Sequence, residues 1–512
     1  MGEEKFYCWK TARPPGHLNV GLILKNAAIS YPNKEIIDGN YDIHRSYREV
    51  DERANRVANG LLARGNLGDF VAIIPRVGSI ESIETYFAIA RAGMIAVPLS
   101  HRLTPSEIEN ILKHINAKAL IFDESFKSTV DQVDLKIDRY MFGIKEGGEY
   151  SYNDLLQYEP TEPDVEIFDH TPACLGFTSG TTGTPKAYIR TSYANFLNHI
   201  LYAISFDMTY QDVALNIVPP LTGISWCAGV MLARGTVISM DFDPVAVLKA
   251  IERYKVTIMY GVPTVYSLML QVPDLDKYDL SSLRAVASVG APLPQSTLRQ
   301  IWEKITPNVY DHIGLQESGF IAVSKPDMKR KKPEAVGPPT PLHEVKIVDE
   351  EGKEKPKGEV GEVVVRYPDG AAGYWQDEEK TREAIKNGWL HTGDLGKIDE
   401  EGHLYIVGRL KDMIVSGGYN VFAIDVENVL MQHPKIADCA AIGLPDETWG
   451  EKVTAIVTLK PGETCTEEEI INFCKDRMAH YKAPKRVFFD NIPRNPAGKA
   501  LKFKLVEKYK GK

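Results

Sequence analysis

Short runs of apolar residues alternate along most of the chain with stretches in which apolar residues recur every three or four positions. The runs predict β-strands, and the stretches between them predict helices. The clearest predicted strands are Phe70–Ile74, Met94–Val97, Ala119–Phe122, Thr236–Ser239, Val256–Met259 and Leu283–Val286. Strands that alternate with helices in this way indicate parallel sheets with helices on their faces.

Several of the predicted helices carry recognisable start signals. The stretch Ser79–Arg91 has the spacing of an amphipathic helix. A second helix is expected just after Thr104, which can cap its first turn while Glu107 closes a capping box. Further helices are expected to begin at Asp243–Pro244 and to cover Val265–Leu270.

The pattern changes in the last third of the chain. From about Val336 it becomes short strands and turns, such as Glu344–Val348 and Gly361–Val365, and a final segment has its own helices and strands. We therefore predict an α/β protein with two domains. Residues 1–410 form a large domain of parallel and mixed sheets flanked by helices, with a β-rich subdomain, and residues 411–512 form a small α+β domain.

Composition narrows the class of protein. Of the 512 residues, 44% are hydrophobic and 25% are charged, which is ordinary for a soluble globular protein. No apolar run approaches the length that a bilayer demands, so we expect no membrane insertion. The first residues lack the apolar segment of a secretory signal, and the net charge of −9 argues against nucleic acid as a partner.

The cysteines are scattered and form no C-x-x-C pair. This spacing indicates neither a disulfide framework nor a zinc site, and it favours a reducing cytoplasm. The six are Cys8, Cys174, Cys227, Cys439, Cys465 and Cys474.

A stretch rich in glycine and hydroxyl groups, Thr178–Lys186 (TSGTTGTPK), directly follows the apolar run Ala173–Phe177. Glycines allow backbone N–H groups to approach a ligand closely, and hydroxyls and an ammonium add donors that suit a polyphosphate. The stretch is not the phosphate loop of P-loop NTPases, since Gly180 and Gly183 are too close and Ala187, not a hydroxyl residue, follows the lysine.

Further motifs follow in a fixed order along nearly the whole chain. They are Ala92-Gly93 through Pro98, Leu103-Thr104-Pro105, Thr178–Lys186, Gly290-Ala291-Pro292, Gly314 with Glu317, Gly373-Tyr374-Trp375, Gly388 through Asp394, Gly408 through Asp412, and Pro496 through Lys499. In these motifs the chain resembles the acyl-adenylating superfamily, which contains acyl-CoA synthetases, adenylation domains of nonribosomal peptide synthesis and beetle luciferases.

The resemblance implies an ATP-dependent ligase that joins a carboxylic acid, as a small-molecule substrate, to coenzyme A through an acyl-AMP intermediate, with Mg2+ as cofactor. AMP and pyrophosphate would be released. One alternative is an acyl-AMP ligase that loads the phosphopantetheine of a carrier protein. Others are a luciferase-like oxygenase and, least favoured, a non-catalytic binding protein that has kept the fold.

The resemblance also assigns roles to particular residues. Lys499, Lys186 and Glu317 would be catalytic, with Lys499 offsetting the repulsion between the carboxylate and the α-phosphate and Glu317 binding the metal. Asp394 would accept hydrogen bonds from the ribose. The residues implied in nucleotide binding are Thr178, Ser179, Gly180, Thr181, Thr182, Gly183, Thr184, Lys186, Gly290, Ala291, Pro292, His312, Ile313, Gly314, Gln316, Asp394, Arg409 and Lys499.

Lys411 matches the hinge of the superfamily, about which the small domain rotates as a lid between adenylation and thioester formation. Rotation would withdraw Lys499 and bring Ser416, Gly417 and Gly418 towards the acyl-adenylate. The two glycines would leave room for the pantetheine arm of coenzyme A.

The chain departs from the superfamily pattern at two places. Where relatives often have Tyr-Gly-x-Thr-Glu, Ile313 replaces the ring and Gln316 replaces the threonine. Where many acyl-CoA synthetases have Pro-Leu-Phe-His, this chain has Pro-Pro-Leu-Thr, ending in Thr222. Trp226 is then the alternative gate, although a tryptophan is more often a core residue than a gate. His312 fits a wall of the acyl pocket slightly better than a ring near the nucleotide or a satisfied polar residue.

The predicted acyl pocket is mostly apolar or aromatic. Its candidates are Thr222, Trp226, Tyr260, Val262 and His312. The aspartate that pairs an amino group in amino-acid-activating relatives has no evident counterpart, and an unpaired ammonium is costly to bury. We therefore expect a hydrophobic acid, aliphatic or aromatic. The sequence decides neither the individual acid nor whether the chain forms a homo-oligomer.

Overall fold

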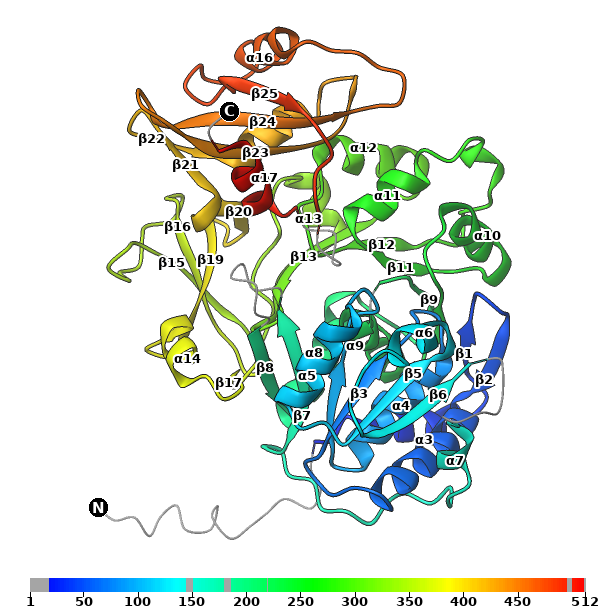
Figure 1. The fold of residues 1–512 in the computed structure, drawn as a ribbon. Helices are drawn as coiled ribbons and strands as arrows, with labels where there is room; N and C mark the ends of the chain where they lie inside the picture. Colours follow the sequence, from blue (N-terminus) through cyan, green and yellow to red (C-terminus); the bar gives the residue numbers. More distant parts are fainter. Residues whose placement is uncertain (1–17, 144–150, 179–185, 219, 495–499, 511–512) are drawn as a thin grey trace, which may run out of the picture.

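The computed structural model describes residues 18–143, 151–178, 186–218, 220–494 and 500–510. A small lobe, formed by the last part of the chain, lies over one end of a much larger lobe (Figure 1). Parallel and mixed sheets flanked by helices make up the large lobe, which confirms the predicted fold class.

The first sheet of the large lobe has the strand order β17-β8-β7-β4-β3-β5-β6. Strands β3 to β7 pair in parallel, whereas β8 and β17 add an antiparallel edge. The bounds are β3 Phe70–Ile74, β4 Ile95–Pro98, β5 Ala119–Asp123, β6 Asp138–Phe142, β7 Pro172–Thr178, β8 Lys186–Thr191 and β17 Gly373–Tyr374.

The second sheet has the order β14-β13-β12-β11-β9-β10-β1-β2. Its inner strands are parallel, and β14 and β2 are antiparallel strands at the two edges. The bounds are β1 Glu35–Asp38, β2 Ile43–Ser46, β9 Val213–Asn216, β10 Thr236–Ser239, β11 Ile258–Gly261, β12 Ala285–Ser288, β13 Val309–Leu315 and β14 Gly319–Ser324.

One layer of helices lies between the two sheets, and further helices cover their outer faces. The alternation along β3 shows this, because Val71 and Ile73 pack into the inner core while Ala72 and Ile74 pack into the outer one. The inner helices are α2 Gly21–Ser30, α3 Tyr47–Leu62, α4 Ile80–Arg91, α7 Asn153–Leu156, α8 Ser192–Ser205 and α9 Pro220–Leu232. The outer helices are α5 Pro105–His114 and α6 Lys127–Val130 on the first sheet, and α10 Pro244–Tyr254, α11 Pro263–Met269 and α12 Gln295–Lys304 on the second. Shorter elements of this lobe are η2 Glu124–Phe126, η3 Leu275–Lys277 and α13 Pro326–Lys331.

The prediction that Ser79–Arg91 forms an amphipathic helix is wrong in one respect. A helix forms there, as α4, but every residue from Ile80 to Arg91 except Glu81 is buried. The reason is its place between the two sheets, which leaves it no solvent face. Its polar members are satisfied by partners, and Arg53, for instance, donates to both carboxylate oxygens of Glu84.

The predicted start signals are confirmed where a hydroxyl residue caps a helix. Thr104 accepts from the backbone N–H of Glu107, whose side chain accepts from Thr104 in return, so the capping box is complete. Thr466 caps α16 Glu467–Lys475. The strands predicted to begin at Val256 and Leu283 begin two residues later, at Ile258 and Ala285.

A β-rich region joins the two lobes. Its sheet has the order β15-β16-β19-β18, with β20 paired to β19, and its own apolar core. The elements are β15 Glu344–Val348, β16 Gly361–Arg366, α14 Glu378–Ala384, β18 Ile385–Lys386, β19 Trp389–Ile398, β20 Leu404–Arg409 and η4 Leu410–Asp412.

The small lobe is an α+β unit whose sheet begins at Met413. The strand order is β22-β21-β24-β23, with β25 beside β24. Helices α15 and α16 cover one face and α17 covers the other. The elements are β21 Met413–Ser416, β22 Tyr419–Phe422, α15 Ala423–Leu430, β23 Ile436–Asp446, β24 Gly450–Leu459, β25 Arg486–Phe489 and α17 Lys502–Tyr509.

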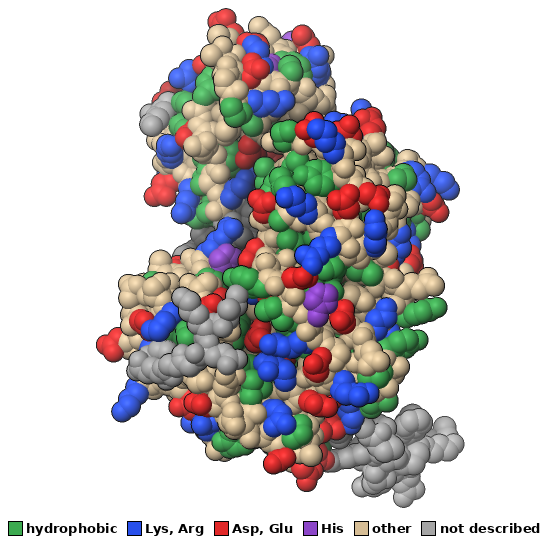
Figure 2. Space-filling model, turned by 90° about the vertical axis from the view of Figure 1, so that its right-hand side faces the viewer, with side chains coloured by type: hydrophobic (Ala, Val, Ile, Leu, Met, Phe, Trp, Pro, Cys, Tyr) green, Lys and Arg blue, Asp and Glu red, His purple; other side chains and the backbone are tan. Residues whose placement is uncertain are grey.

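The surface carries charges of both signs. On the face in Figure 2, Lys and Arg side chains are interspersed with Asp and Glu, without a continuous basic band. Within the described part of the chain, no helix is long and apolar enough to span a bilayer.

Candidate active site

The predicted phosphate loop connects β7 to β8, which pair as an antiparallel hairpin with Thr178 opposite Lys186. The side chain of Thr178 and the residues after it lie outside the described residues, so the structure does not place these predicted donors: Ser179, Gly180, Thr181, Thr182, Gly183 and Thr184. Lys186 opens β8, and its Nζ lies 5.2 Å from the centroid of the Tyr374 ring. The lysine therefore lies at the base of the loop, against an aromatic face.

The predicted metal ligand lies beside the same ring. Gln316, Glu317 and the next residue form the turn between β13 and β14. The Tyr374 hydroxyl donates to Oε1 of Glu317 at 3.0 Å. Burial and the neighbouring carboxylate raise the pKa of Tyr374, so the hydroxyl keeps its proton. Tyr374 thus connects Lys186 to Glu317.

Every backbone carbonyl of this turn is held by a donor. Arg190 Nη2 donates to the carbonyl of Gln316 at 2.7 Å, and the backbone N–H of Ala371 donates to that of Glu317 at 2.6 Å. The following carbonyl, of Ser318, lies 3.0 Å from Nε2 of His343. These hydrogen bonds fix the turn before any ligand is bound.

The two residues predicted to hold the ribose and the nucleotide face each other on adjacent strands. Asp394 of β19 pairs with Arg409 of β20, and Nε of Arg409 donates to Oδ1 of Asp394 at 2.8 Å. Within β19 the residue before Asp394 is held by Glu362, whose Oε1 accepts from the backbone N–H of Gly393 at 3.0 Å. The Asp394 carboxylate is therefore buried and held in one orientation.

The predicted adenine segment follows β12. Gly290 has a φ of +84°, a conformation that favours glycine, and Ala291 and Pro292 follow it. A methyl group added to Gly290 would lie 3.5 Å from Cγ1 of Val262. Val262, predicted for the acyl pocket, therefore borders the adenine segment.

A bulge interrupts β13 between Ile313 and Gly314. A Cβ atom on Gly314 would lie 2.4 Å from the carbonyl oxygen of Gly319, so only glycine fits. The bulge redirects the strand immediately before Gln316 and separates it from His312.

Three of the predicted acyl-pocket residues form one continuous aromatic stack with Phe320. Trp226 of α9 stacks on Tyr260 of β11 with centroids 4.7 Å apart, and Tyr260 stacks on His312 at 5.7 Å. His312 then stacks on Phe320 at 4.1 Å. Thr222 lies half-buried near the start of α9.

The stack is closely packed and uncharged. Trp226 and Tyr260 are 0% exposed and His312 is 6% exposed. Burial lowers the pKa of His312 to about 3, so the imidazole is neutral near pH 7. Its Nε2 is hydrogen-bonded to the Tyr260 hydroxyl at 2.8 Å. Trp226 and Tyr260 therefore belong to the inner core of the large lobe, and of these three residues His312 alone retains measurable exposed area.

The predicted hinge, Lys411, lies in η4 between the last strand of the β-rich region and the first strand of the small lobe. Desolvation lowers its pKa. Just beyond it, β21 and β22 are joined by Gly417 and Gly418, with φ of +59° and +80°. Positive φ at both positions is the requirement of a type I′ turn.

The two glycines, which were predicted to leave room for the pantetheine arm, differ in the space around them. A Cβ on Gly417 would lie 2.8 Å from the Trp449 ring, whereas a Cβ on Gly418 would meet nothing within 4 Å. Open space is therefore present at Gly418, and Ser416 is buried. Lys499 lies outside the described residues.

The sequence does not indicate the contacts of Tyr188 and Arg190 with Gln316, nor those of Tyr374 with Lys186 and Glu317. The Tyr188 hydroxyl donates to Oε1 of Gln316 at 2.5 Å. Tyr374 was part of a recognised motif without a role, and nothing marked Tyr188 or Arg190. Their contacts depend on strand pairing between distant segments, which the sequence does not display.

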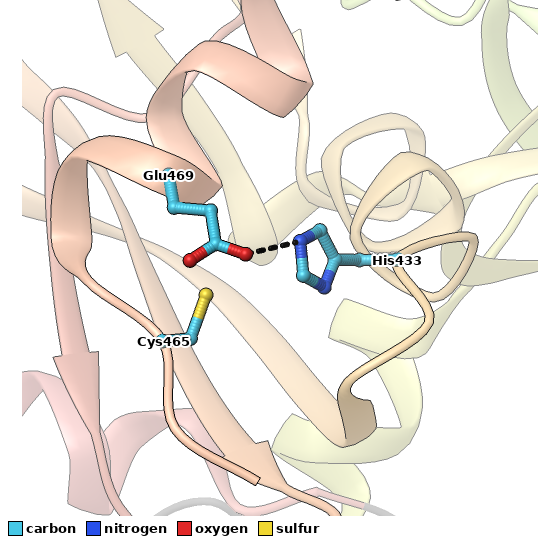
Figure 3. Close-up of side chains that lie close together, drawn as sticks. All are labelled: His433, Cys465 and Glu469. Carbon is cyan, nitrogen blue, oxygen red and sulfur yellow. Dashed lines mark ion pairs between the residues drawn. The ribbon is translucent and has the colours of Figure 1, made fainter.

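The small lobe brings His433, Cys465 and Glu469 together (Figure 3). One potential ligand atom from each lies within 4.8 Å of the others, which the cysteine spacing did not predict. However, the Lys435 ammonium lies 2.9 Å from Oε1 of Glu469, and the Lys435 backbone N–H donates to Nδ1 of His433. The ring proton then belongs on Nε2, the nitrogen that faces Glu469 at 3.7 Å. A metal ion can bind only a ring nitrogen that carries no proton. The cluster of His433, Cys465 and Glu469 is therefore better explained as part of an ion-pair network.

Comparison with known proteins covers almost the whole chain. The family profile described as "AMP-binding enzyme" matches residues 24–375, and that described as "AMP-binding enzyme C-terminal domain" matches residues 425–499.

Individual relatives extend over the same length. The chain is 34% identical to the long-chain-fatty-acid–CoA ligase FadD13 of Mycobacterium tuberculosis, covering 96% of this chain and 98% of that protein. It is 34% identical to a feruloyl-CoA synthase of Amycolatopsis, covering 91% and 94%. The ATP-bound crystal structure of MatB from Rhodopseudomonas palustris superposes with a TM-score of 0.88 at 31% identity, covering 97% and 99%.

Proposed function

Since the chain belongs to the AMP-binding enzyme family and is an AMP-forming acyl-CoA synthetase, we propose that its substrate is a hydrophobic aliphatic or aromatic carboxylic acid. The enzyme uses ATP and CoA and passes through an acyl-AMP. The observation that carries the proposal is the neutral stack of Trp226, Tyr260 and His312. The relatives named for a long-chain fatty acid and for ferulate support both kinds of acid.

The chemistry needs cations because two anions must meet. A carboxylate repels nucleophiles, and its transfer to AMP gives a mixed anhydride with a good leaving group. We assign Lys186, with the glycine- and hydroxyl-rich loop before it, to the β- and γ-phosphates. Lys499 would offset the repulsion between the carboxylate and the α-phosphate in the transition state.

Glu317 would hold Mg2+. The donor set fits, because a carboxylate oxygen is a ligand that this hard cation prefers. Oε1 of Glu317 accepts from the Tyr374 hydroxyl, so we assign metal binding to Oε2. When bound, the metal neutralises phosphate charge.

Asp394 and Arg409 would hold the sugar and phosphate side of the nucleotide. Their ion pair at 2.8 Å orients the carboxylate to accept from the ribose hydroxyls. Gly290-Ala291-Pro292 would lie along the adenine, where small residues permit close approach.

The second half-reaction would use the other face of the small lobe. We place the domain boundary near Lys411, which lies two residues before the sheet of the small lobe begins at Met413. Rotation there would bring Ser416, Gly417 and Gly418 to the acyl-adenylate. We also propose a cytoplasmic location, supported by free thiols at the five described cysteines, Cys174, Cys227, Cys439, Cys465 and Cys474.

A panel of acids tests the substrate class. Pyrophosphate release and hydroxamate trapping are measured with short, medium, branched and aromatic acids and with α-amino acids of matched size. We expect apolar acids to exceed amino acids by about tenfold or more, because an ammonium would be buried unpaired. The Lys499→Ala variant supplies the background rate.

The acceptor is decided in the same assay. Thioester formation is compared between free CoA and a phosphopantetheinylated carrier protein, and we expect free CoA to be used.

In the panel of acids, a preference for amino acids would contradict the proposed substrate class.

A further inference from the structure

Two tyrosines face each other across the antiparallel edge of the first sheet, and each reaches one of two consecutive residues in the β13–β14 turn. Tyr188 of β8 pairs with Tyr374 of β17. Residues directly opposite each other in an antiparallel pair project from the same face. Tyr374 donates to Glu317 and Tyr188 donates to Gln316.

Tyr188 is a buried residue that contacts Gln316 through its hydroxyl. Its side chain is 0% exposed, and its hydroxyl lies 2.5 Å from Oε1 of Gln316. Burial raises the pKa of Tyr188 well above its usual value, so the hydroxyl acts as a donor throughout the working pH range. Two residues further along β8, Arg190 is also buried and donates to the backbone carbonyl of Gln316. Both ends of this one residue are therefore held by β8.

Room for the tyrosine is made by a glycine on the next strand. Gly176 of β7 lies opposite Tyr188, and a Cβ atom there would lie 2.1 Å from the Tyr188 hydroxyl oxygen and 2.2 Å from Cζ. Any side chain at this position would displace the ring. The missing side chain at Gly176 therefore provides the space in which the Tyr188 ring reaches Gln316.

The arrangement leaves the two amide hydrogens of Gln316 available. Its Oε1 is committed to Tyr188, and among the described residues no hydrogen bond of its Nε2 is found. The residue is half-buried and directly precedes Glu317. An amide NH2 group at this place can donate to an oxyanion of the reactants, either the acid's carboxylate or the α-phosphate.

We propose that Tyr188 is a positioning residue for adenylation, which orients the Gln316 carboxamide so that its NH2 group faces the reacting anions. This inference rests on the proposed assignment of Gln316 to the nucleotide site. A donor that is already oriented costs no reorganisation during the reaction, and it is worth more there than a freely rotating amide.

The test is a double-mutant cycle on pyrophosphate release, with Tyr188→Phe, Gln316→Ala and the double variant. Tyr188→Phe keeps the ring and is expected to lower kcat about tenfold with little change in the KM values, since a transition-state donor is lost. In the Gln316→Ala background the same change should have no further effect. A change confined to the KM for the acid or for ATP would contradict the proposal, because it would mean that the amide acts in ground-state binding.

Two controls separate orientation from general damage. Tyr47→Phe removes another buried hydroxyl, which donates to the carbonyl of Gly235 away from the site, and should leave kcat unchanged. Conversion of supplied acyl-adenylate to thioester should be normal in Tyr188→Phe. Gly176→Ala, which displaces the ring, should reproduce the loss of pyrophosphate release.

Independent, multiplicative losses in the double variant would overturn the inference, as would wild-type kcat in Tyr188→Phe. A wild-type protein that releases no pyrophosphate with any acid would overturn the proposed function itself, and the inference with it.

Discussion

The side chain of Tyr374 shows how one residue prepares a site made by others. Its ring lies against Lys186, and its hydroxyl holds Oε1 of Glu317. Two groups of opposite charge that are distant in sequence are therefore placed around one aromatic ring. Loss of a group that orients a metal ligand typically costs about 10- to 100-fold in metal affinity or activity.

Tyr374→Phe should therefore raise the Mg2+ concentration needed for half-maximal pyrophosphate release by about tenfold, because Glu317 loses the donor that orients it. The measurement is a magnesium titration at saturating ATP and acid. Tyr405→Phe is the matched control, since it removes a tyrosine–carboxylate hydrogen bond to Asp399 elsewhere. An unchanged magnesium dependence in Tyr374→Phe would show that Glu317 does not need the hydroxyl.

At the scale of elements, helix α5 depends on a capping box. Thr104 accepts from the backbone N–H of Glu107, and the Glu107 carboxylate accepts from the backbone N–H of Thr104 at 2.8 Å. The backbone hydrogen bond from Thr104 lowers the pKa of Glu107. The helix is short, so the cap is a large part of its local stability.

Thr104→Ala should destabilise α5 locally by about 1 kcal/mol, because an acceptor for the first turn is lost. Hydrogen exchange of the α5 amides, followed by mass spectrometry, should be faster than in the wild type. Thr104→Ser retains the hydroxyl and should exchange at the wild-type rate. Equal exchange in the alanine and serine variants would argue against the cap.

The elements also show how far sequence reasoning reaches. The bounds of β3, β10 and β15 are as predicted because each is a short apolar or alternating run between clear breaks. The burial of α4 was missed because the pattern within one helix does not reveal that sheets lie on both sides of it. The sequence motifs point to Lys186 and Glu317 as candidates, whereas nothing in the sequence points to Tyr188, because its contact with Gln316 arises from the register between β7, β8 and β17.

At the scale of the whole molecule, the described chain divides into two lobes joined near η4 (Figure 1). The large lobe carries Glu317 and the buried aromatic stack, and the small lobe carries the Gly417–Gly418 turn. A single chain that must perform two half-reactions at one site can do so by turning one lobe against the other.

Lys411→Pro should lower thioester formation by about tenfold while adenylation is less affected, because proline fixes φ at the proposed hinge. The two half-reactions are measured separately, by pyrophosphate release and by conversion of supplied acyl-adenylate. Lys411→Ala removes the charge but keeps backbone freedom, and it should preserve both. Equal losses in both half-reactions of the proline variant would exclude the hinge.

The position of α4 between the two large sheets has a consequence for how the chain acquires its structure. Helix α4 packs against α3, α2 and β4, which are close to it in sequence, and also against β1, which joins the second sheet by pairing with β10 from far along the chain. A fragment that ends before β9 would expose that helix to water and aggregate. The two halves of the large lobe should therefore unfold together in one transition, and limited proteolysis should not release either half as a stable piece.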